Sequence, residues 1–310
     1  RQESGIAPFF VVGGASVLAE AARRRGLAVE IEVISDPAKT ALVFDRAIPV
    51  LGTEDVAATP GKPDEPGAAL ALHSLAEATR YCLLGASAGL VTAPIGKAQL
   101  AKVGFEYPGQ TEFLAEVCGL APDEAVMMLA GPSLRAVPLT VHCALADVPG
   151  RLSQELITRR ARIVAAALAH DFGIAEPRIA VCGLNPHAGE NGRFGDEEAR
   201  IIAPAIETLV AEGIAVTGPH PADALFTPRA RQTYDAALAM YHDQALVPLK
   251  ALDFDEGVNV TLGLPIVRTS PDHGTAFDIA GRGLAEPGAM IAALKMAGEI
   301  AARRKHAHAG

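Results

Sequence analysis

Short apolar runs alternate with helical segments along this chain, and this alternation constrains the fold more than any other feature. The sequence predicts a strand at residues 9–13, a helix at 17–25 that ends at Gly26, and a second strand at 29–34. Such alternation is typical of α/β proteins with largely parallel sheets. A chain of 310 residues is long enough for one large or two medium domains.

The same pattern continues toward the C-terminus. Further strands are predicted at residues 89–93, 126–130, 139–145, 179–182, 214–217, 236–241 and 258–262. Further helices are predicted at 69–84, 153–172, 196–212 and 289–304, with a kink at Pro204 because proline removes a backbone hydrogen bond. Ligands of open α/β sheets bind beyond the carboxyl ends of the strands, so we expect the functional residues in the loops there.

Charge and cysteine content exclude several classes of protein. Asp and Glu number 36 against 27 for Lys and Arg, a net charge of -9 that disfavours nucleic acid or an anionic membrane as partner. The four cysteines are widely spaced and form no C-x-x-C pair. They indicate core thiols of a cytoplasmic protein rather than a disulfide framework. No run reaches the roughly 18 apolar residues of a membrane span.

Three histidines share one context. His142, His187 and His242 each lie within or just beyond a predicted strand, and His187 lies in the glycine-rich stretch 183–192. A single histidine of this kind is usually a core residue, but parallel strands ending at a common edge would bring three imidazoles together. Imidazole is the commonest neutral metal ligand, and three protein ligands with an open position are typical of a catalytic metal site. The pattern therefore predicts a divalent cation that polarises a substrate hydroxyl and carbonyl.

Other polar residues are candidates for supporting roles. Asp243 and Asp223 are expected to orient a ligand histidine, bind the metal or move a proton, with a helix cap or a loop salt bridge as the alternative. Lys97 follows a strand directly and either meets a phosphate or carboxylate or is solvated. Gln110 and Thr111 precede a helix, where they either cap it or contact an anion at its N-terminus.

Charged and amide side chains also interrupt an otherwise apolar region. Lys250, Asn259 and Arg268 are spread over it, and a charge in such surroundings needs a partner. Arginine suits a bidentate grip on phosphate or carboxylate, and lysine offers a point charge. Ordinary ion pairs with nearby carboxylates are the alternative.

These motifs resemble one enzyme family. The stretches 140–147, 183–190, 239–244, 257–265 and 268–276 are similar to 4-hydroxythreonine-4-phosphate dehydrogenases of pyridoxal phosphate biosynthesis, and the resemblance covers nearly everything from Phe9 onward. It implies a two-domain α/β fold like that of isocitrate and isopropylmalate dehydrogenases. It also implies a homodimer whose active site lies in the interdomain cleft at the dimer interface. The expected domains are 1–107 with 265–310, which carries the cofactor loop, and 108–264, which carries the metal ligands and dimer contacts.

The resemblance also implies the chemistry. It assigns a divalent metal (zinc, magnesium or cobalt) to His142, His187 and His242, and substrate contacts to Gln110, Thr111, Lys250, Asn259 and Arg268. The implied reaction oxidises 4-phosphooxy-L-threonine with NAD and releases CO₂, giving 3-amino-2-oxopropyl phosphate. A metal that acidifies the hydroxyl and cations that neutralise the phosphate agree with these residue types.

The expected cofactor site is a loop rather than a Rossmann fingerprint, since no G-x-G-x-x-G follows a strand. Residues 273–281 resemble the adenosine-binding loop of the isopropylmalate dehydrogenase group, and the cofactor candidates there are His273, Gly274, Thr275, Ala276 and Asp278. A carboxylate at Asp278 would accept a hydrogen bond from a ribose hydroxyl and repel a 2′-phosphate, which favours NAD over NADP. The alternative is a helix-opening loop with Asp278 merely exposed.

Two departures from the family keep other functions open. Gln110 stands where the family usually carries histidine, and glutamine adds no charge. A relative acting on D-threonate or D-erythronate 4-phosphate, or on a carboxylated cis-dihydrodiol, is therefore the nearest rival. A metal-dependent hydrolase and a non-catalytic phosphate-binding module are rivals from other classes. The family's opening strand and Gly-Asp-Pro turn are also absent before Gly5, and the chain starts at Arg1, so we expect its true start further upstream.

Overall fold

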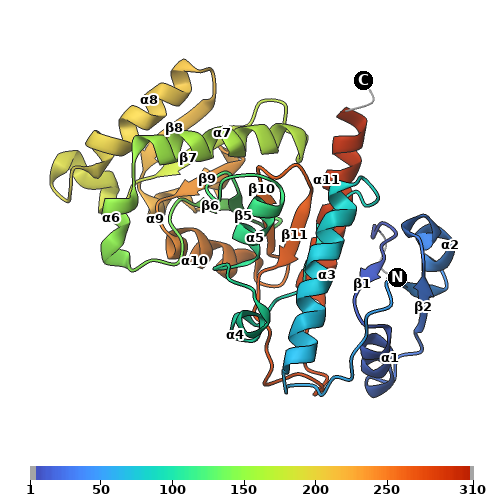
Figure 1. Ribbon diagram of the computed structural model, residues 1–310. Helices are drawn as coiled ribbons and strands as arrows, with labels where there is room; N and C mark the ends of the chain where they lie inside the picture. Colours follow the sequence, from blue (N-terminus) through green and yellow to red (C-terminus); the bar gives the residue numbers. More distant parts are fainter. Residues whose placement is uncertain (1–4, 308–310) are drawn as a thin grey trace. The chain divides into compact units, whose positions relative to one another are not determined.

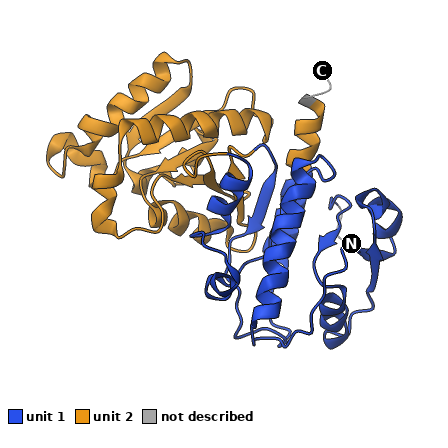
Figure 2. Cartoon of the chain, viewed as in Figure 1, with its two compact units in different colours: residues 1–119, 265–298 blue, residues 120–264, 299–310 orange. Residues whose placement is uncertain are grey.

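The computed structural model describes residues 5–307 and divides into two compact units. Unit 1 comprises Arg1–Gly119 and Pro265–Gly298, and unit 2 comprises Leu120–Leu264 and Glu299–Gly310 (Figure 2). The expected segment upstream of Gly5 lies outside the described residues. Both units mix helices and strands, so the predicted α/β class is confirmed.

Unit 1 contains a parallel three-stranded sheet with the order β1-β3-β2 and a second parallel pair, β4 with β11. Its strands are β1 (Val11–Val12), β2 (Glu30–Ile34), β3 (Ala47–Leu51), β4 (Leu90–Val91) and β11 (Arg268–Pro271). Its helices are α1 (Ala15–Arg24), α2 (Thr40–Phe44), α3 (Glu65–Leu83), α4 (Lys97–Leu100), α5 (Gln110–Val117) and the first part of α11 (Gly288–Ala307).

Unit 2 is built on the strand order β10-β5-β6-β9-β7-β8, in which β6, β9, β7 and β8 run parallel. Its strands are β5 (Val126–Ala130), β6 (Arg135–Pro138), β7 (Arg178–Cys182), β8 (Ala215–His220), β9 (Ala236–Ala239) and β10 (Val258–Leu262). Its helices are α6 (Val148–Arg151), α7 (Gln154–His170), α8 (Ala203–Ala211), α9 (Ala222–Leu225) and α10 (His242–Asp253). Helices α7 and α10 lie on opposite sides of these strands (Figure 1).

Small side chains in the central strand let a helix pack closely on unit 2. All four residues of β9 are buried, and Leu246 and Leu249 of α10 pack against Ala237 and Ala239. Cys182, at the end of β7, belongs to the same core, and burial raises the pKa of its thiol to about 12. A thiol held protonated in an apolar core is unreactive, as the cysteine spacing predicts.

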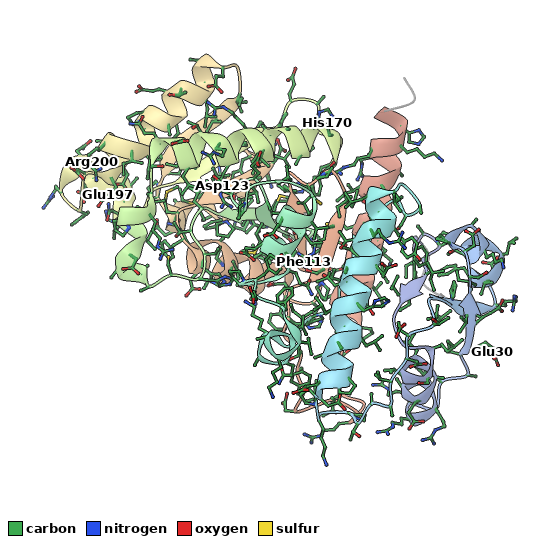
Figure 3. The ribbon with its side chains drawn as sticks, in the orientation of Figure 1. Glu30, Phe113, Asp123, His170, Glu197 and Arg200 are labelled. Carbon is green, nitrogen blue, oxygen red and sulfur yellow. The ribbon has the colours of Figure 1, made fainter. Side chains whose placement is uncertain are left out.

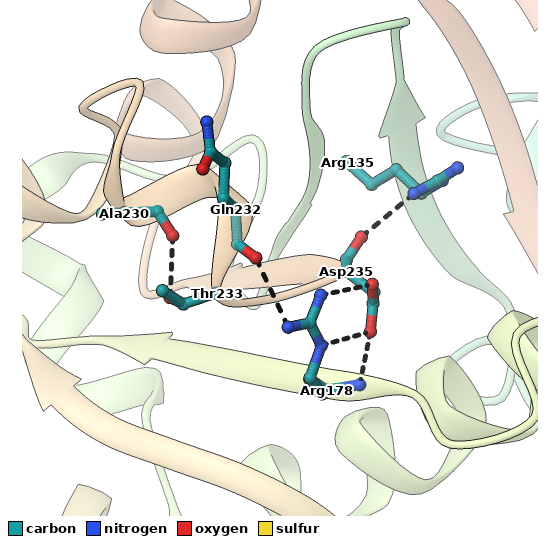
Figure 4. A network of polar contacts seen from close by, with 6 residues as sticks. All are labelled: Arg135, Arg178, Ala230, Gln232, Thr233 and Asp235. Carbon is teal, nitrogen blue, oxygen red and sulfur yellow. Dashed lines mark hydrogen bonds and ion pairs between the residues drawn. The ribbon is translucent and has the colours of Figure 1, made fainter.

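A polar network fixes the starts of the central parallel strands (Figure 4). The backbone N–H and the guanidinium of Arg178 donate to the carboxylate of Asp235, at 2.8 Å for the backbone and 3.0 Å for Nη2 to Oδ1. Burial alone would raise the pKa of Asp235, but the hydrogen bonds from Arg178 outweigh it, and the net pKa is lowered. The charged pair therefore sets the register of β7 beside β9.

The structure corrects three predictions about elements of unit 2. Residues 139–145 do not form a strand, because β6 ends at Pro138 and His142 has a φ of 48°, which no strand accommodates. The strand predicted at 236–241 ends at Ala239, and α10 begins at His242 in a region with no predicted helix. Pro204 lies in the first turn of α8, and a π-helical segment, Glu198–Ile202, precedes it where the kink is predicted.

None of the helices built from residues 5–307 combines the length and apolar character needed to cross a bilayer.

Candidate active site

Two of the three predicted metal ligands meet at one edge of the unit 2 strands. His142 follows β6 and His242 follows β9, and these strands are parallel neighbours. The two imidazole rings lie with their centroids 6.1 Å apart and an interplanar angle of 40°. The prediction that parallel strands deliver histidines to a shared edge therefore holds for this pair.

Buried polar side chains join the ends of the three strands. The Thr140 hydroxyl donates to the Met240 carbonyl at 2.8 Å. Gln244 accepts from the Met240 backbone N–H at 2.6 Å and donates to the Gly183 carbonyl, beyond β7, at 2.8 Å. Both side chains are buried. Sequence reasoning missed them, although a polar residue next to a histidine at a strand end is a usable signal.

The third histidine lies on an unusual turn. After β7, five consecutive residues, 187–191, have left-handed backbone dihedrals, with a φ of 54° at His187. Left-handed conformations cost roughly 1–2 kcal/mol for each non-glycine residue, so surrounding contacts must hold this turn. The His187 side chain is 68% exposed, and its Nδ1 lies 3.4 Å from Glu190 Oε2. We call residues 187–191 the His187 turn.

The buried carboxylate of Glu198 stabilises the His187 turn. Glu198 accepts from the backbone N–H of Asn185 at 2.7 Å and from its side-chain amide at 3.0 Å. A Cβ added at Gly189 would lie 2.7 Å from Glu198 Oε2, so glycine is required there for close approach as well as for its φ of 79°. Glu197, labelled in Figure 3 with Arg200, accepts from the side-chain amide of Asn185 at 2.7 Å.

The predicted supporting carboxylates differ in placement. Asp243 Oδ1 lies 2.7 Å from His242 Nδ1, which leaves Nε2 of that ring for another partner. Asp223 is exposed on α9. Among residues 5–307, no group of three or more His, Cys, Asp or Glu side chains could hold a metal ion. One chain therefore gathers two of the three imidazoles and not the third.

Unit 1 contains a buried polar cluster around Arg268. Arg268 Nη2 donates to Thr92 Oγ1 at 2.9 Å and to Gln110 Oε1 at 2.7 Å, and the Thr92 hydroxyl donates to the same Gln110 oxygen at 2.7 Å. Burial lowers the pKa of Arg268 to about 10, so it remains a cation at neutral pH. We call these three residues the Arg268 group. It includes Gln110 and Arg268, both predicted to contact the substrate.

The start of α5 positions Gln110 and Thr111. Gly109 is the residue before the helix, and Gln110 and Thr111 are its first two residues, so the alternative in which they cap the helix is wrong. The Lys97 ammonium would lie 3.8 Å from a Cβ at Gly109, which places this lysine beside the same helix end. Phe113 (Figure 3) packs edge-on against Tyr107, with ring centroids 5.3 Å apart, and anchors the helix.

The remaining predicted substrate contacts belong to unit 2. Lys250 is exposed on α10, and Asn259 lies on β10 opposite Leu129. Asn259 Oδ1 is buried and accepts no hydrogen bond from the described residues. A buried acceptor of this kind is costly unless a ligand supplies a donor.

The predicted cofactor loop borders a pocket within unit 1. The pocket has a volume of about 640 Å³, and Thr275, Phe277 and Ala280 line it together with α1, the 56–64 loop and the start of α3. Ala276 has a φ of 47°. His273, Gly274 and Asp278 are exposed, and Asp278 is not part of the pocket lining. The volume lies within the 300–1,000 Å³ typical of small-molecule sites.

Comparison with known proteins identifies the family. The family "Pyridoxal phosphate biosynthetic protein PdxA" matches residues 5–297. The 4-hydroxythreonine-4-phosphate dehydrogenase of Erythrobacter litoralis is 64% identical over 99% of this chain and 91% of its own length, and that of Zymomonas mobilis is 50% identical over 98% and 90%. A crystal structure of the Klebsiella pneumoniae enzyme of that name superposes with a TM-score of 0.87 at 39% identity, covering 97% of this chain and 91% of its own. The predicted family and the predicted oxidoreductase class are confirmed, and the chain belongs to the pyridoxal phosphate biosynthetic protein PdxA family.

Proposed function

We propose that this chain is an NAD- and divalent-metal-dependent 4-hydroxythreonine-4-phosphate dehydrogenase that acts in the cytoplasm. Its reaction would oxidise the secondary alcohol of 4-phosphooxy-L-threonine and release CO₂, giving 3-amino-2-oxopropyl phosphate. The observation that carries this proposal is the 64% identity, over nearly the whole chain, to a relative of that name.

Two groups of residues would bind the substrate. The Arg268 group supplies a buried guanidinium, and Thr111 and Lys97 lie at the α5 end, where an anion is favoured. Lys250 adds a cation, and the orphaned Asn259 Oδ1 suits a donor such as a substrate ammonium. A ligand with an anion and an amine matches these residues better than an anion alone.

The unit 1 pocket is the proposed NAD site. NAD would accept the hydride from the substrate carbinol carbon. Thr275 and Phe277 line the pocket and offer a hydroxyl and an aromatic surface, and Arg24 and Lys62 bring cations to its wall. We propose that the Asp278 carboxylate, exposed next to the pocket-lining Phe277, reaches the cofactor ribose from the rim of the pocket and favours NAD over NADP.

The His142–His242 pair fits a divalent cation in part. Its two rings are close enough to share one ion, and Asp243 orients one of them. A cation there would acidify the substrate hydroxyl and polarise the adjacent carbonyl. Because His187 lies on an exposed turn outside this pair, we propose that His187 of a second copy completes the site. Asp223 remains a candidate for moving the proton.

Exposed apolar side chains support this second copy. Each histidine has one nearby in sequence: Leu145 is 66% exposed, Phe194 47% and Val247 64%. Contiguous apolar surface marks protein interfaces, and a second copy seated over the histidines would bury these three side chains together. We therefore propose a homodimer with isocitrate dehydrogenase-like domains, 1–107 with 265–310 and 108–264, and an active site in the interdomain cleft at the dimer interface.

NADH absorbance tests the function directly. The enzyme is assayed with NAD and 4-phosphooxy-L-threonine across a series of divalent metals, before and after chelation, and then with D-erythronate 4-phosphate and a carboxylated cis-dihydrodiol. We expect turnover of phosphooxythreonine that chelation abolishes and metal restores. Turnover of only the other substrates would refute the assignment, and activity without nucleotide would indicate the hydrolase.

A further inference from the structure

We propose that Thr92, which no motif singles out as a site residue, is a positioning residue for substrate binding: together with Gln110 it fixes the Arg268 guanidinium and leaves Gln110 able only to donate to the substrate. This inference rests on the proposed function, in which Arg268 contacts an anionic substrate.

The strand register explains why Thr92 and Arg268 meet. β4 and β11 run parallel with Arg268 opposite Leu90, and Thr92 continues the ladder through its N–H to the Thr269 carbonyl at 3.1 Å. Thr92 lies two residues beyond Leu90, so its side chain is on the same face as that of Leu90. The Arg268 side chain needs only to extend along this face to reach the Thr92 hydroxyl at 2.9 Å.

The direction of each hydrogen bond in this cluster is determined. A guanidinium only donates, so the atoms of Thr92 and Gln110 that face Arg268 Nη2 are acceptors. The single Thr92 proton then goes to Gln110 Oε1 at 2.7 Å. Gln110 Nε2 in turn donates to the Ala93 carbonyl at 3.1 Å. Both lone pairs of Oε1 are used, and one N–H of the Gln110 amide remains.

The consequence is a selective arrangement of polar groups. A remaining N–H of Gln110 can only donate, so it suits a fully deprotonated phosphate or carboxylate oxygen and disfavours a hydroxyl that must donate. Thr92 and Arg268 are 6% and 4% exposed, so little water competes for these bonds. Removing the Thr92 hydroxyl therefore takes one acceptor from Arg268 Nη2 and removes the donor that orients Gln110 Oε1.

The test uses the full-length enzyme with inorganic phosphate as competitive inhibitor. Thr92→Val is expected to raise the KM for phosphooxythreonine and the inhibition constant of phosphate by about ten-fold each, the value of one hydrogen bond to a charged group, while kcat stays nearly constant. Thr92→Ser, which keeps the hydroxyl, restores both constants. Thr92→Ala, which also removes the hydroxyl, reproduces the Thr92→Val defect should that variant fold poorly.

Thr79→Val is the matched control, because the Thr79 hydroxyl is also buried in unit 1 but bonds only the Leu75 carbonyl within α3. It should leave both constants at their wild-type values. A Thr92→Val enzyme with unchanged constants, or a Thr92→Ser enzyme as impaired as Thr92→Val, overturns the inference. Wild-type enzyme that neither turns over the substrate nor binds phosphate refutes the proposed function instead.

Discussion

The Arg268 group and the histidine region differ in how complete they are within one chain. Arg268 and Thr92 are buried, each donates to Gln110 Oε1 at 2.7 Å, and Arg268 also donates to Thr92 at 2.9 Å. The histidine region has two imidazoles 6.1 Å apart and a third that is 68% exposed. A hydrogen-bonded, desolvated cluster is already organised for binding, whereas an exposed ligand on a strained turn needs a further partner.

Anion binding and metal binding therefore have separate structural requirements in the proposed mechanism. The proposed anion-binding group draws all three of its residues from unit 1 of one chain. The proposed metal site, in contrast, depends on association of two copies, so its activity should depend on protein concentration. Substitutions in the two regions should therefore affect metal binding and anion binding separately.

The largest effect is expected from the histidines. His142→Ala, His187→Ala and His242→Ala should each lower kcat/KM by about a thousand-fold, since each removes one of the proposed metal ligands. If His187 acts in trans, mixed dimers of the His187→Ala and His242→Ala chains contain one intact site. Co-refolding these two inactive variants should therefore restore up to about a quarter of wild-type activity, measured by NADH production.

The matched control mixes His142→Ala with His242→Ala. These residues lie in the same pair, so every site of the mixed dimer lacks one ligand and no activity should return. Recovery in this control, or none in the His187 mixture, would contradict a partner-supplied His187.

Arg268 is expected to give the next largest effect. Arg268→Met should lower kcat/KM for phosphooxythreonine by about a hundred-fold, because the proposed charged donor to the substrate is lost together with the hydrogen bonds to Thr92 and Gln110. Metal binding should not change, since the histidines belong to the other unit. Steady-state kinetics and a cobalt titration measure the two effects separately. Arg80→Met serves as control, because Arg80 is half exposed on α3 and its contacts are with Glu77 and the Tyr81 ring of the same helix. Loss of cobalt binding in Arg268→Met would show that the Arg268 group and the histidine region are not independent.

The sequence predicted more about strands than about the loops that follow them. Apolar runs located β7, β9 and β10 to within a few residues, because buried strands require such runs. The α10 helix was missed, since residues 242–253 combine a proline and charges with an apolar run. The predicted histidine edge was right for His142 and His242, whose strands are neighbours.

The rest depends on contacts between distant residues, which no local pattern contains. Gln110 accepts from Arg268, which is 158 positions away in the sequence. The motif around Gln110 therefore gives no indication of this hydrogen bond. The left-handed run at 187–191 similarly depends on Glu198, which a helical pattern would place on an ordinary helix face. Loop conformation is decided by such tertiary partners rather than by propensity.

Substitution of Glu198 tests whether its carboxylate stabilises the His187 turn. Glu198→Ala should lower the free energy of unfolding by about 2–3 kcal/mol, because the buried Asn185 donors lose their acceptor and the left-handed turn loses its support. Cobalt affinity should fall in parallel, whereas phosphate binding should not change. Denaturant unfolding and cobalt titration provide the measurements.

Glu197→Ala is the matched control for this carboxylate. Its neighbour Glu197 is less buried and accepts from the side-chain amide of Asn185 but not from its backbone N–H, so this substitution should cost less than about 0.5 kcal/mol. Equal losses from the two variants would show that carboxylate charge, rather than the specific Glu198 contacts, supports the turn.

The smallest effect is expected from a substitution that relieves backbone strain in the His187 turn. Ala188 has a φ of 51° and a ψ of 45°, a conformation that glycine adopts without a Cβ clash. Ala188→Gly should therefore raise the free energy of unfolding by about 0.5–1 kcal/mol, even though glycine makes the unfolded chain more flexible. The same change at Ala166, exposed in the middle of α7, should lower stability by about 1 kcal/mol, because the backbone there is right-handed. Opposite signs in urea unfolding of the two variants would confirm that strain is concentrated where His187 is presented, and a destabilised Ala188→Gly would show that the turn is not strained.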